Sequence, residues 1–336
     1  MAGWLRSGRR RAAGIAAGLA LLLVCMMGSL LFGVHTYRLE QLWTAYADFA
    51  GTNEQLILRT SRVPRTLIAA FVGACLAVAG CVMQVLTKNP LASPSVFGVN
   101  SGASLLIVIG LTAYGSSMSM VNMVWVAFVG AGAAAACVLV LGLGIGGRFD
   151  PIRLTLAGAA FAAFASSATS GLILLNKQSL DAALLWMIGS VSGRKLEHLA
   201  AVLPYMAAGL LLAMLLSASL NVMALGDDNA RSLGQRLGLV RLLAAAAVVL
   251  LAGSSVAAAG PIAFVGLVVP HLCRSLVGND HRWLLPYCAL TGAILLVAAD
   301  TVSRLILMPK EVPVGVATAI IGVPFLIRAA RGRSHE

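Results

Sequence analysis

The chain has 336 residues, of which 60% are hydrophobic and only 11% are charged, and its formal net charge is +12. A soluble domain carries roughly 25% charged residues, so this composition excludes a large water-soluble fold. The basic residues form no stripe with aromatic partners, which argues against nucleic acid and favours contact with anionic lipid headgroups. We therefore predict an all-α integral membrane protein.

Stretches of about 20 residues without charge predict the helices that span a membrane. The first such stretch is longer than the core of a signal peptide, about 7–15 residues, and so indicates a span. Two longer stretches are divided at turn-forming residues, at 114–117 and at Gly260-Pro261. The resulting prediction is a single transmembrane domain over 1–336 with ten spans, at 12–34, 66–87, 95–112, 122–143, 154–176, 199–220, 241–259, 262–277, 283–303 and 313–328.

Ten spans place both termini on the same side of the membrane. With the N-terminus inside, 15 of the 24 lysines and arginines lie inside and 9 lie outside. This bias predicts cytoplasmic termini. The outside count is high for such a protein, and this excess of positive charge calls for an explanation.

No residues that could carry covalent chemistry or hold a metal stand out. The six cysteines include no CxxC pair and lie mostly in apolar stretches, where they indicate packing rather than a disulfide or metal site. The phosphate-binding pattern GxxxxGK[ST] is absent, so the chain itself is not expected to use ATP, and a partner is the expected source of energy for transport. Asp300 is the one acidic residue within a predicted span. It either pairs with Arg304 four residues later or serves as the coupling carboxylate of an ion-driven carrier.

The segment 225–238 lies between the sixth and seventh predicted spans, on the cytoplasmic side. Its apolar residues recur at helical spacing and its glycines can end short helices. Two interpretations stay open, an amphipathic element that docks into a partner's cleft and an ordinary solvated loop. The candidate partner contacts are Leu225, Gly226, Asp227, Ala230, Arg231, Leu233 and Gly234.

Several short motifs occur in a fixed order along the chain. They are 62–67 (RVPRTL), 83–84 (MQ) with 89–94 (NPLASP), 156–158 (LAG), 186–190 (WMIGS), 260–271 (GPIAFVGLVVPH), 299–304 with Asp300 and Arg304, and 311–315 (EVPVG). Together with the segment 225–238, this ordered set resembles the iron-siderophore and vitamin B12 permease family of ABC importers, of the FecCD and BtuC-like type. The resemblance covers roughly residues 40–330.

The resemblance implies the type II ABC importer permease fold and a set of partners. In that family two permease subunits, identical or paralogous, pair about a two-fold axis. Two cytoplasmic ABC ATPase subunits grip the segments that correspond to 225–238, and an extracytoplasmic substrate-binding protein docks outside. Arginines on the outer surface meet glutamates of the binding protein, and the matching positions are Arg62, Arg65 and Arg304. Such a patch would explain the excess outside charge, because arginine holds a carboxylate bidentately. The alternatives are headgroup contact for Arg62 and Arg65 and pairing with Asp300 for Arg304.

The same resemblance places an inner gate at Pro151 and Ile152. Family members often carry small hydroxyl residues there and this sequence does not, which leaves the chemistry of its gate open. The fifth span and its symmetry mate would line the pathway. Its hydroxyl residues either line that pathway or pack against other helices, and they are Ser166, Ser167, Thr169 and Ser170.

These observations predict a permease subunit, not an enzyme, that carries an iron–siderophore complex across the bacterial cytoplasmic membrane. The chain itself is expected to bind no cofactor and no metal, since ATP is used by the partner subunit. Cobalamin or haem are alternative cargoes on the same scaffold. An ion-coupled secondary transporter is the alternative of another class.

Overall fold

The computed structural model describes residues 5, 7–115, 118–143, 150–175, 180–307 and 310–331. Over these residues the chain forms helices and no strand, which confirms the predicted all-α class. The predicted turn between the third and fourth spans includes Ser116 and Ser117, and these two lie outside the described residues.

Seven helices of the described chain are long and apolar enough to cross a membrane. They are α1 (Gly8–Leu31), the continuous helix Asn53–Leu86 that contains α3, η1 and α4, α6 (Met120–Gly142), α7 (Pro151–Leu175), α9 (Leu196–Leu215), α12 (Leu237–Ala259) and α14 (His281–Ile306). Three shorter apolar helices are α5 (Val99–Tyr114), α13 (Val265–Val277) and α15 (Val314–Arg331). Seven long and three short helices fit a fold of about ten transmembrane helices. The exact limits of each span stay a prediction.

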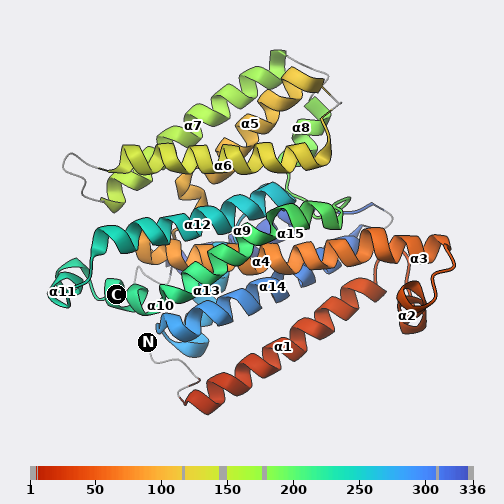
Figure 1. Cartoon of the computed structure of the whole chain (residues 1–336), viewed down its shortest axis with the longest axis horizontal. Coiled ribbons are helices and arrows are strands. Elements are labelled where there is room, and N and C mark those ends of the chain that lie inside the picture. The colour runs from red at the N-terminus through yellow and green to blue at the C-terminus, as the bar shows by residue number, and fades with distance from the viewer. Residues whose placement is uncertain are drawn as a thin grey trace.

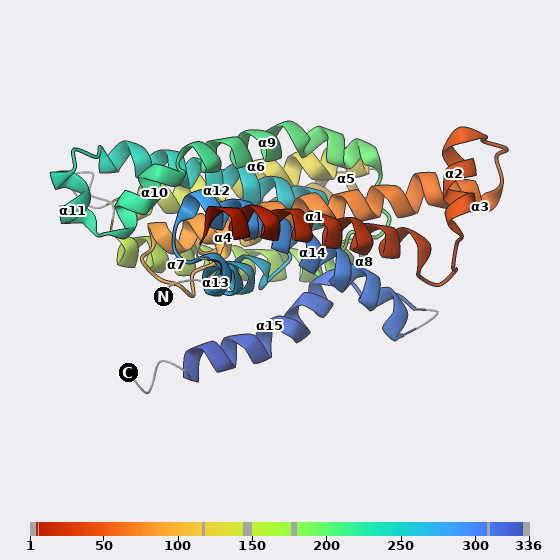
Figure 2. The ribbon, with the colours of Figure 1, turned by 90° about the horizontal axis from the view of Figure 1, so that it is seen from below.

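The remaining helices are short and lie between the long ones. They are α2 (Leu39–Ala47), the 3-10 turn η2 (Pro94–Phe97), α8 (Leu180–Met187), α10 (Ser217–Ala224) and α11 (Asp227–Ser232). The continuous helix Asn53–Leu86 consists of α3 (Asn53–Ile57), the π-helical turn η1 (Leu58–Arg62) and α4 (Val63–Leu86). The long helices run roughly along one direction, with α11 at one end of the bundle and α2 and α3 at the other (Figures 1 and 2). We call these the α11 end and the α2 end. α1 begins and α15 ends toward the α11 end (Figure 2).

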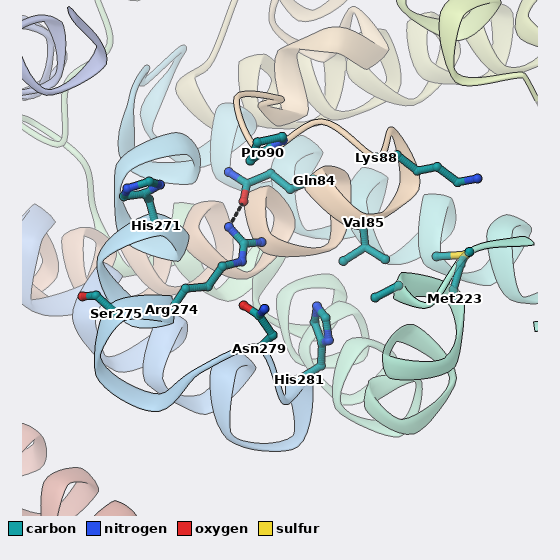
Figure 3. Close-up of a pocket in the computed structure, with 12 residues that line it drawn as sticks. Gln84, Val85, Lys88, Pro90, Met223, His271, Arg274, Ser275, Asn279 and His281 are labelled. Atoms are coloured by element: carbon teal, nitrogen blue, oxygen red, sulfur yellow. Dashed lines mark hydrogen bonds between the residues drawn. The ribbon is translucent and has the colours of Figure 1, made fainter. Parts of the chain in front are cut away.

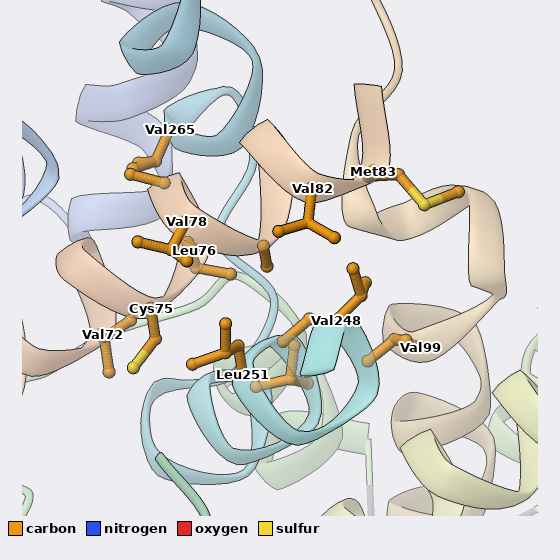
Figure 4. Packing of buried hydrophobic residues seen from close by; sticks show 14 of the residues in the cluster. Val72, Cys75, Leu76, Val78, Val82, Met83, Val99, Val248, Leu251 and Val265 are labelled. Carbon is orange, nitrogen blue, oxygen red and sulfur yellow. The ribbon is translucent and has the colours of Figure 1, made fainter. Parts of the chain in front are cut away.

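α4 and α12 form the centre of the bundle. In their most apolar 18-residue windows 78% and 72% of residues are buried, against 6% in α1 and 17% in α7. Valine, leucine and alanine side chains fill the contact between them, such as Val72 and Leu76 of α4 against Val248 and Leu251 of α12 (Figure 4). A helix buried on nearly all sides is hydrophobic all round, as α4 is.

Glycines bring α4 close to two of its other neighbours. A Cβ atom added to Gly80 would overlap the backbone carbonyl of Gly266 in α13, and one added to Gly73 would overlap that of Gly292 in α14. Small residues at such crossings let helix backbones approach closely, which is how helices associate in lipid. The many glycines of the sequence therefore serve packing at these positions.

The predicted break at Gly260-Pro261 separates α12 from α13. Gly260 has a φ of 73°, a conformation that glycine adopts without strain, and it ends α12. Phe264 is also left-handed, with a φ of 69°, and α13 begins at the next residue. The connection between the first two predicted spans, 35–65, is largely helical in the structure, because α2, α3, η1 and the start of α4 lie within it.

Candidate functional site

Arg65 of α4 lies at the centre of a buried ion cluster at the α2 end. Its Nε and Nη2 donate to the carboxylate of Asp300 in α14 at 2.9–3.0 Å, and its Nη1 donates to Glu311 at 2.6 Å. Asp300 is fully buried and Arg65 is 5% exposed. Glu311 lies in the connection after α14, and Ser192 also donates to it at 3.2 Å. Arg65 is thus held by a buried carboxylate on one side and by a carboxylate nearer the surface on the other.

Arg304 uses the second oxygen of the same Asp300. The two side chains pair at 3.0 Å, one helical turn apart on α14. Arg304 also donates to the hydroxyl of Ser29 in α1 at 2.6 Å and to its carbonyl oxygen at 3.1 Å. The ion pair between Asp300 and Arg304 is one of the two roles that the sequence left open for Asp300.

Arg62 lies beside this cluster but has different partners. Its guanidinium donates to backbone carbonyls near the end of α1, those of Ser29, Phe32 and His35. It also lies over the ring of Tyr37, 5.4 Å from the centroid. A cation at the C-terminal end of a helix satisfies carbonyls that have no partner within the helix, so Arg62 secures the end of α1.

The structure therefore brings the three predicted docking arginines together, at exposures of 8% for Arg62, 5% for Arg65 and 1% for Arg304. Their contact with a binding protein stays a prediction. Sequence reasoning assigned no role to Glu311 or Ser29, which complete the cluster. An acidic residue in an outer connection that carries excess arginine would have been the signal for Glu311. Burial raises the pKa of Glu311, but the hydrogen bond and charge of Arg65 outweigh this, and the pKa is lowered.

At the α11 end, the segment 225–238 contains α11 between two glycines in left-handed conformations, Gly226 (φ 104°) and Gly234 (φ 77°). Ala230 is fully buried, whereas Leu225 and Leu233 are 60% and 66% exposed. Ala230 therefore packs against the bundle, whereas the two leucines that flank the helix face outward. Exposed leucines flanking a short helix are what a partner's cleft can take up.

Asp227 fixes the position of α11. Its Oδ1 pairs with Lys88, in the connection after α4, at 2.9 Å and with Arg241 of α12 at 2.7 Å. Partial burial raises the pKa of Asp227, but the hydrogen bonds and charges of Lys88 and Arg241 outweigh it, so the pKa is lowered. The first helical residue of α11 is therefore tied to two other parts of the bundle.

The predicted gate residues lie near α11. Pro151 and Ile152 are the first residues of α7, the side chain of Asp150 accepts from the backbone N–H of Ile152 at 2.9 Å, and Ile152 is 71% exposed. Pro151 and Asp150 share a cavity of about 580 Å³ with Asp227 and Arg231. Residues 144–149, which precede this site, lie outside the described residues. The gating role stays a prediction.

The predicted hydroxyl residues of α7 do not all face one way. Thr169 is buried and donates to the carbonyl of Ala165 at 2.7 Å. Ser166 and Ser170 are exposed and line a small cavity together with Thr169 and with Ser101 and Ser104 of α5. Ser167 is exposed and is not part of that cavity. Of the four, Thr169 has the contacts of a packing residue.

The described residues contain no cluster of three or more histidine, cysteine or acidic side chains that could hold a metal ion. The fold and these sites define a multi-span helical membrane protein with a charged cluster at one end and a tethered short helix at the other.

Comparison with known proteins identifies the group to which this architecture belongs. The chain matches the FecCD transport family over residues 21–331. It is 48% identical to YfiZ of Bacillus subtilis (strain 168), a "Probable siderophore transport system permease protein", over 93% of both chains. It is 41% identical to the ferric enterobactin transport system permease protein FepD of Escherichia coli (strain K12), over 97% of both chains. An inward-facing structure assigned to a metal-chelate type ABC transporter superposes with a TM-score of 0.83 at 26% identity, over 94% of this chain and 97% of that one.

The chain belongs to the FecCD transport family. It is a permease subunit of an ABC importer in a bacterial membrane, a transport subunit and not an enzyme. Membership of the family also means that it works with an ATPase and a substrate-binding partner. The predicted family and class are thereby confirmed.

Proposed function

We propose that this permease carries a ferric siderophore complex into the cytoplasm. The observation that carries the proposal is the agreement among its relatives, whose names include siderophore, ferric enterobactin and Fe(3+)-citrate import. The hemin transport system permease protein HmuU of Yersinia pestis is less similar, at 35% identity over 92% of both chains. A ferric siderophore is therefore favoured over haem as the cargo.

In this proposal the α2 end faces outward and the α11 end faces the cytoplasm, as the charge bias of the sequence predicts. The cluster of Arg62, Arg65 and Arg304 supports binding-protein docking at the α2 end, because guanidinium groups there exceed the two carboxylates that pair with them. Glutamates of a binding protein would pair with this excess positive charge. One of them could take the place of Glu311 as a partner of Arg65.

The ATPase docks on α11 and the exposed Leu225 and Leu233. Movement of α11 is passed to α4 and α12 through the ties of Asp227 to Lys88 and Arg241. Since α4 and α12 are the most buried helices, a shift there moves the whole subunit. Paired subunits, identical or paralogous, then rock between outward and inward states around a pathway lined by α7.

The test is uptake into vesicles that contain the permease with its ATPase, with binding protein outside. We expect ATP-dependent uptake of ferric siderophore and none of hemin or cobalamin. Arg62→Gln should lower the affinity for the binding protein, while Arg38→Gln, at an exposed arginine of the same end, should not. Size exclusion of each variant checks that it is folded.

Uptake of hemin alone would show that the cargo is wrong. Uptake without ATP that an uncoupler abolishes would favour the ion-coupled carrier and contradict the coupling role of α11. Unchanged affinity in Arg62→Gln would contradict docking at this arginine.

A further inference from the structure

A pocket of about 530 Å³ lies at the α11 end, next to the start of α11, and its lining includes Lys88, the partner of Asp227. Four parts of the chain meet there (Figure 3). They are the end of α4 and the connection after it, with Gln84 and Lys88, the end of α10, with Met223, α13, with His271 and Arg274, and the connection into α14, with Asn279. No aspartate or glutamate lines it. Its charged lining is therefore entirely basic.

Arg274 supplies an unneutralised positive charge to this pocket. It donates to the side-chain oxygen of Gln84 (Figure 3). Within the described parts of the chain it forms no ion pair with a carboxylate. A guanidinium has five N–H donors and no acceptor, so one amide oxygen leaves most of them available for an anion.

Gln84 adds a second donor that has no acceptor. The residue is 4% exposed, and its oxygen is taken by Arg274. Its Nε2 is buried with no hydrogen-bond partner among the described residues. Leaving a buried donor unpaired is costly. The guanidinium and the amide nitrogen together point to an acceptor-rich group that the chain itself does not supply.

The rest of the lining indicates what carries that group. Val85, Pro90 and Met223 give the pocket an apolar side. Nearby, Arg11 of α1 lies over the ring of Trp283 in α14, 5.9 Å from its centroid. Tryptophan and arginine at a helix end are typical of the boundary between lipid and water. A ligand with an oxyanion and an apolar body matches both sides of this pocket.

We propose that this pocket binds the phosphate group of an anionic phospholipid, with Arg274 and the Nε2 of Gln84 as donors. Basic pockets between helices at the cytoplasmic side are where acidic headgroups bind. Arginine suits a phosphate because two parallel N–H groups can contact two of its oxygens. The proposal is independent of the cargo and of docking.

The test is titration of the full chain, purified in neutral detergent and freed of lipid, with dioctanoylphosphatidylglycerol, followed by native mass spectrometry. Dioctanoylphosphatidylcholine and inorganic phosphate are the comparison ligands. Arg274→Gln should weaken binding of phosphatidylglycerol by about tenfold to a hundredfold, the effect of losing one charged hydrogen bond. Gln84→Leu keeps the charge and removes the amide donor, so it should weaken binding about tenfold even if Arg274→Gln fails to fold.

Arg282→Gln is the matched control, because Arg282 is an exposed arginine of the same end that does not line the pocket. Equal binding of the two lipids, or unchanged binding in both pocket variants, overturns the proposal. Displacement of the lipid by an equal concentration of inorganic phosphate assigns the donors to free phosphate and overturns the lipid source. Loss of lipid when the ATPase is bound assigns the pocket to that protein instead.

Discussion

Asp300 joins two arginines that come from distant parts of the sequence. It is fully buried and pairs with Arg65, 235 residues earlier, and with Arg304 on its own helix. Removing one partner of a buried ion pair leaves an uncompensated charge, which costs more than the pair contributes. Glu311 differs, because it is 35% exposed and water can replace it.

Asp300→Asn should therefore destabilise the chain far more than Glu311→Gln. We expect a loss of about 3–5 kcal/mol for Asp300→Asn and at most about 1 kcal/mol for Glu311→Gln. Thermal unfolding of the purified chain in one detergent measures both. Equal midpoints for the two variants would contradict the central role of Asp300.

At the scale of an element, few contacts fix the position of α11. It has six residues, too few to be a stable helix alone. Ala230 provides one buried contact, and Asp227 provides two ion pairs. A short helix held this way can shift as a unit when a partner pulls on it.

The tie of Asp227 should depend on pH. Its native pKa is lowered, so its stabilising effect is complete above the ordinary aspartate value of about 3.9 and is lost as the pH falls through the native pKa. At pH 7 hydrogen exchange over 225–234 should be roughly two- to fivefold faster in Asp227→Asn than in the native chain. The difference should begin to shrink below about pH 4 and disappear once the pH lies below the lowered native pKa of Asp227.

Asp228→Asn is the matched control, since Asp228 is exposed and forms no ion pair in the described structure. It should exchange at the native rate at every pH. A faster rate in both variants would mean that charge in general, rather than the tie of Asp227, holds α11.

At the scale of the whole molecule, two long apolar helices are poorly covered. Few residues of α1 and α7 are buried in the single chain, and exposed ones include Leu19 at 50% and Phe164 at 66%. Lipid can cover both. In the proposed pair of subunits the two helices have different surroundings, because α7 would face the second permease and α1 would face lipid.

Cysteine cross-linking should separate the two surfaces. In a chain with Cys25 and Cys137 changed to serine, Phe164→Cys should give a cross-linked pair of permeases with a short bifunctional maleimide. Leu19→Cys, on α1, should give single chains only. Cross-linking through the cysteine at position 19 and not through the one at position 164 would show that α1, and not α7, forms the subunit interface, and would contradict our proposal.

The sequence alone predicted the helical class because hydropathy and charge spacing are local properties. The ion pair between Asp300 and Arg304 could also be predicted from the sequence, since a spacing of four residues places two side chains on one face of a helix. The contacts of Arg65 with Asp300 and Glu311 could not be predicted in this way, because they join positions that are 235 and 246 residues apart. The pocket at Arg274 and Gln84, 190 residues apart, likewise depends on how α4 and α13 cross.

The contacts of Ser29 also set an order of events during synthesis. A chain is made from its N-terminus, so α1 enters the membrane before α4 and α14. Its end meets Arg62 and Thr66 as soon as α4 follows, but Arg304 is made only 275 residues after Ser29. The outer end of α1 thus acquires its contacts in two stages, early and very late. A nascent chain interrupted before α14 therefore carries an α1 whose outer end has its contacts with Arg62 and Thr66 but lacks those with Arg304.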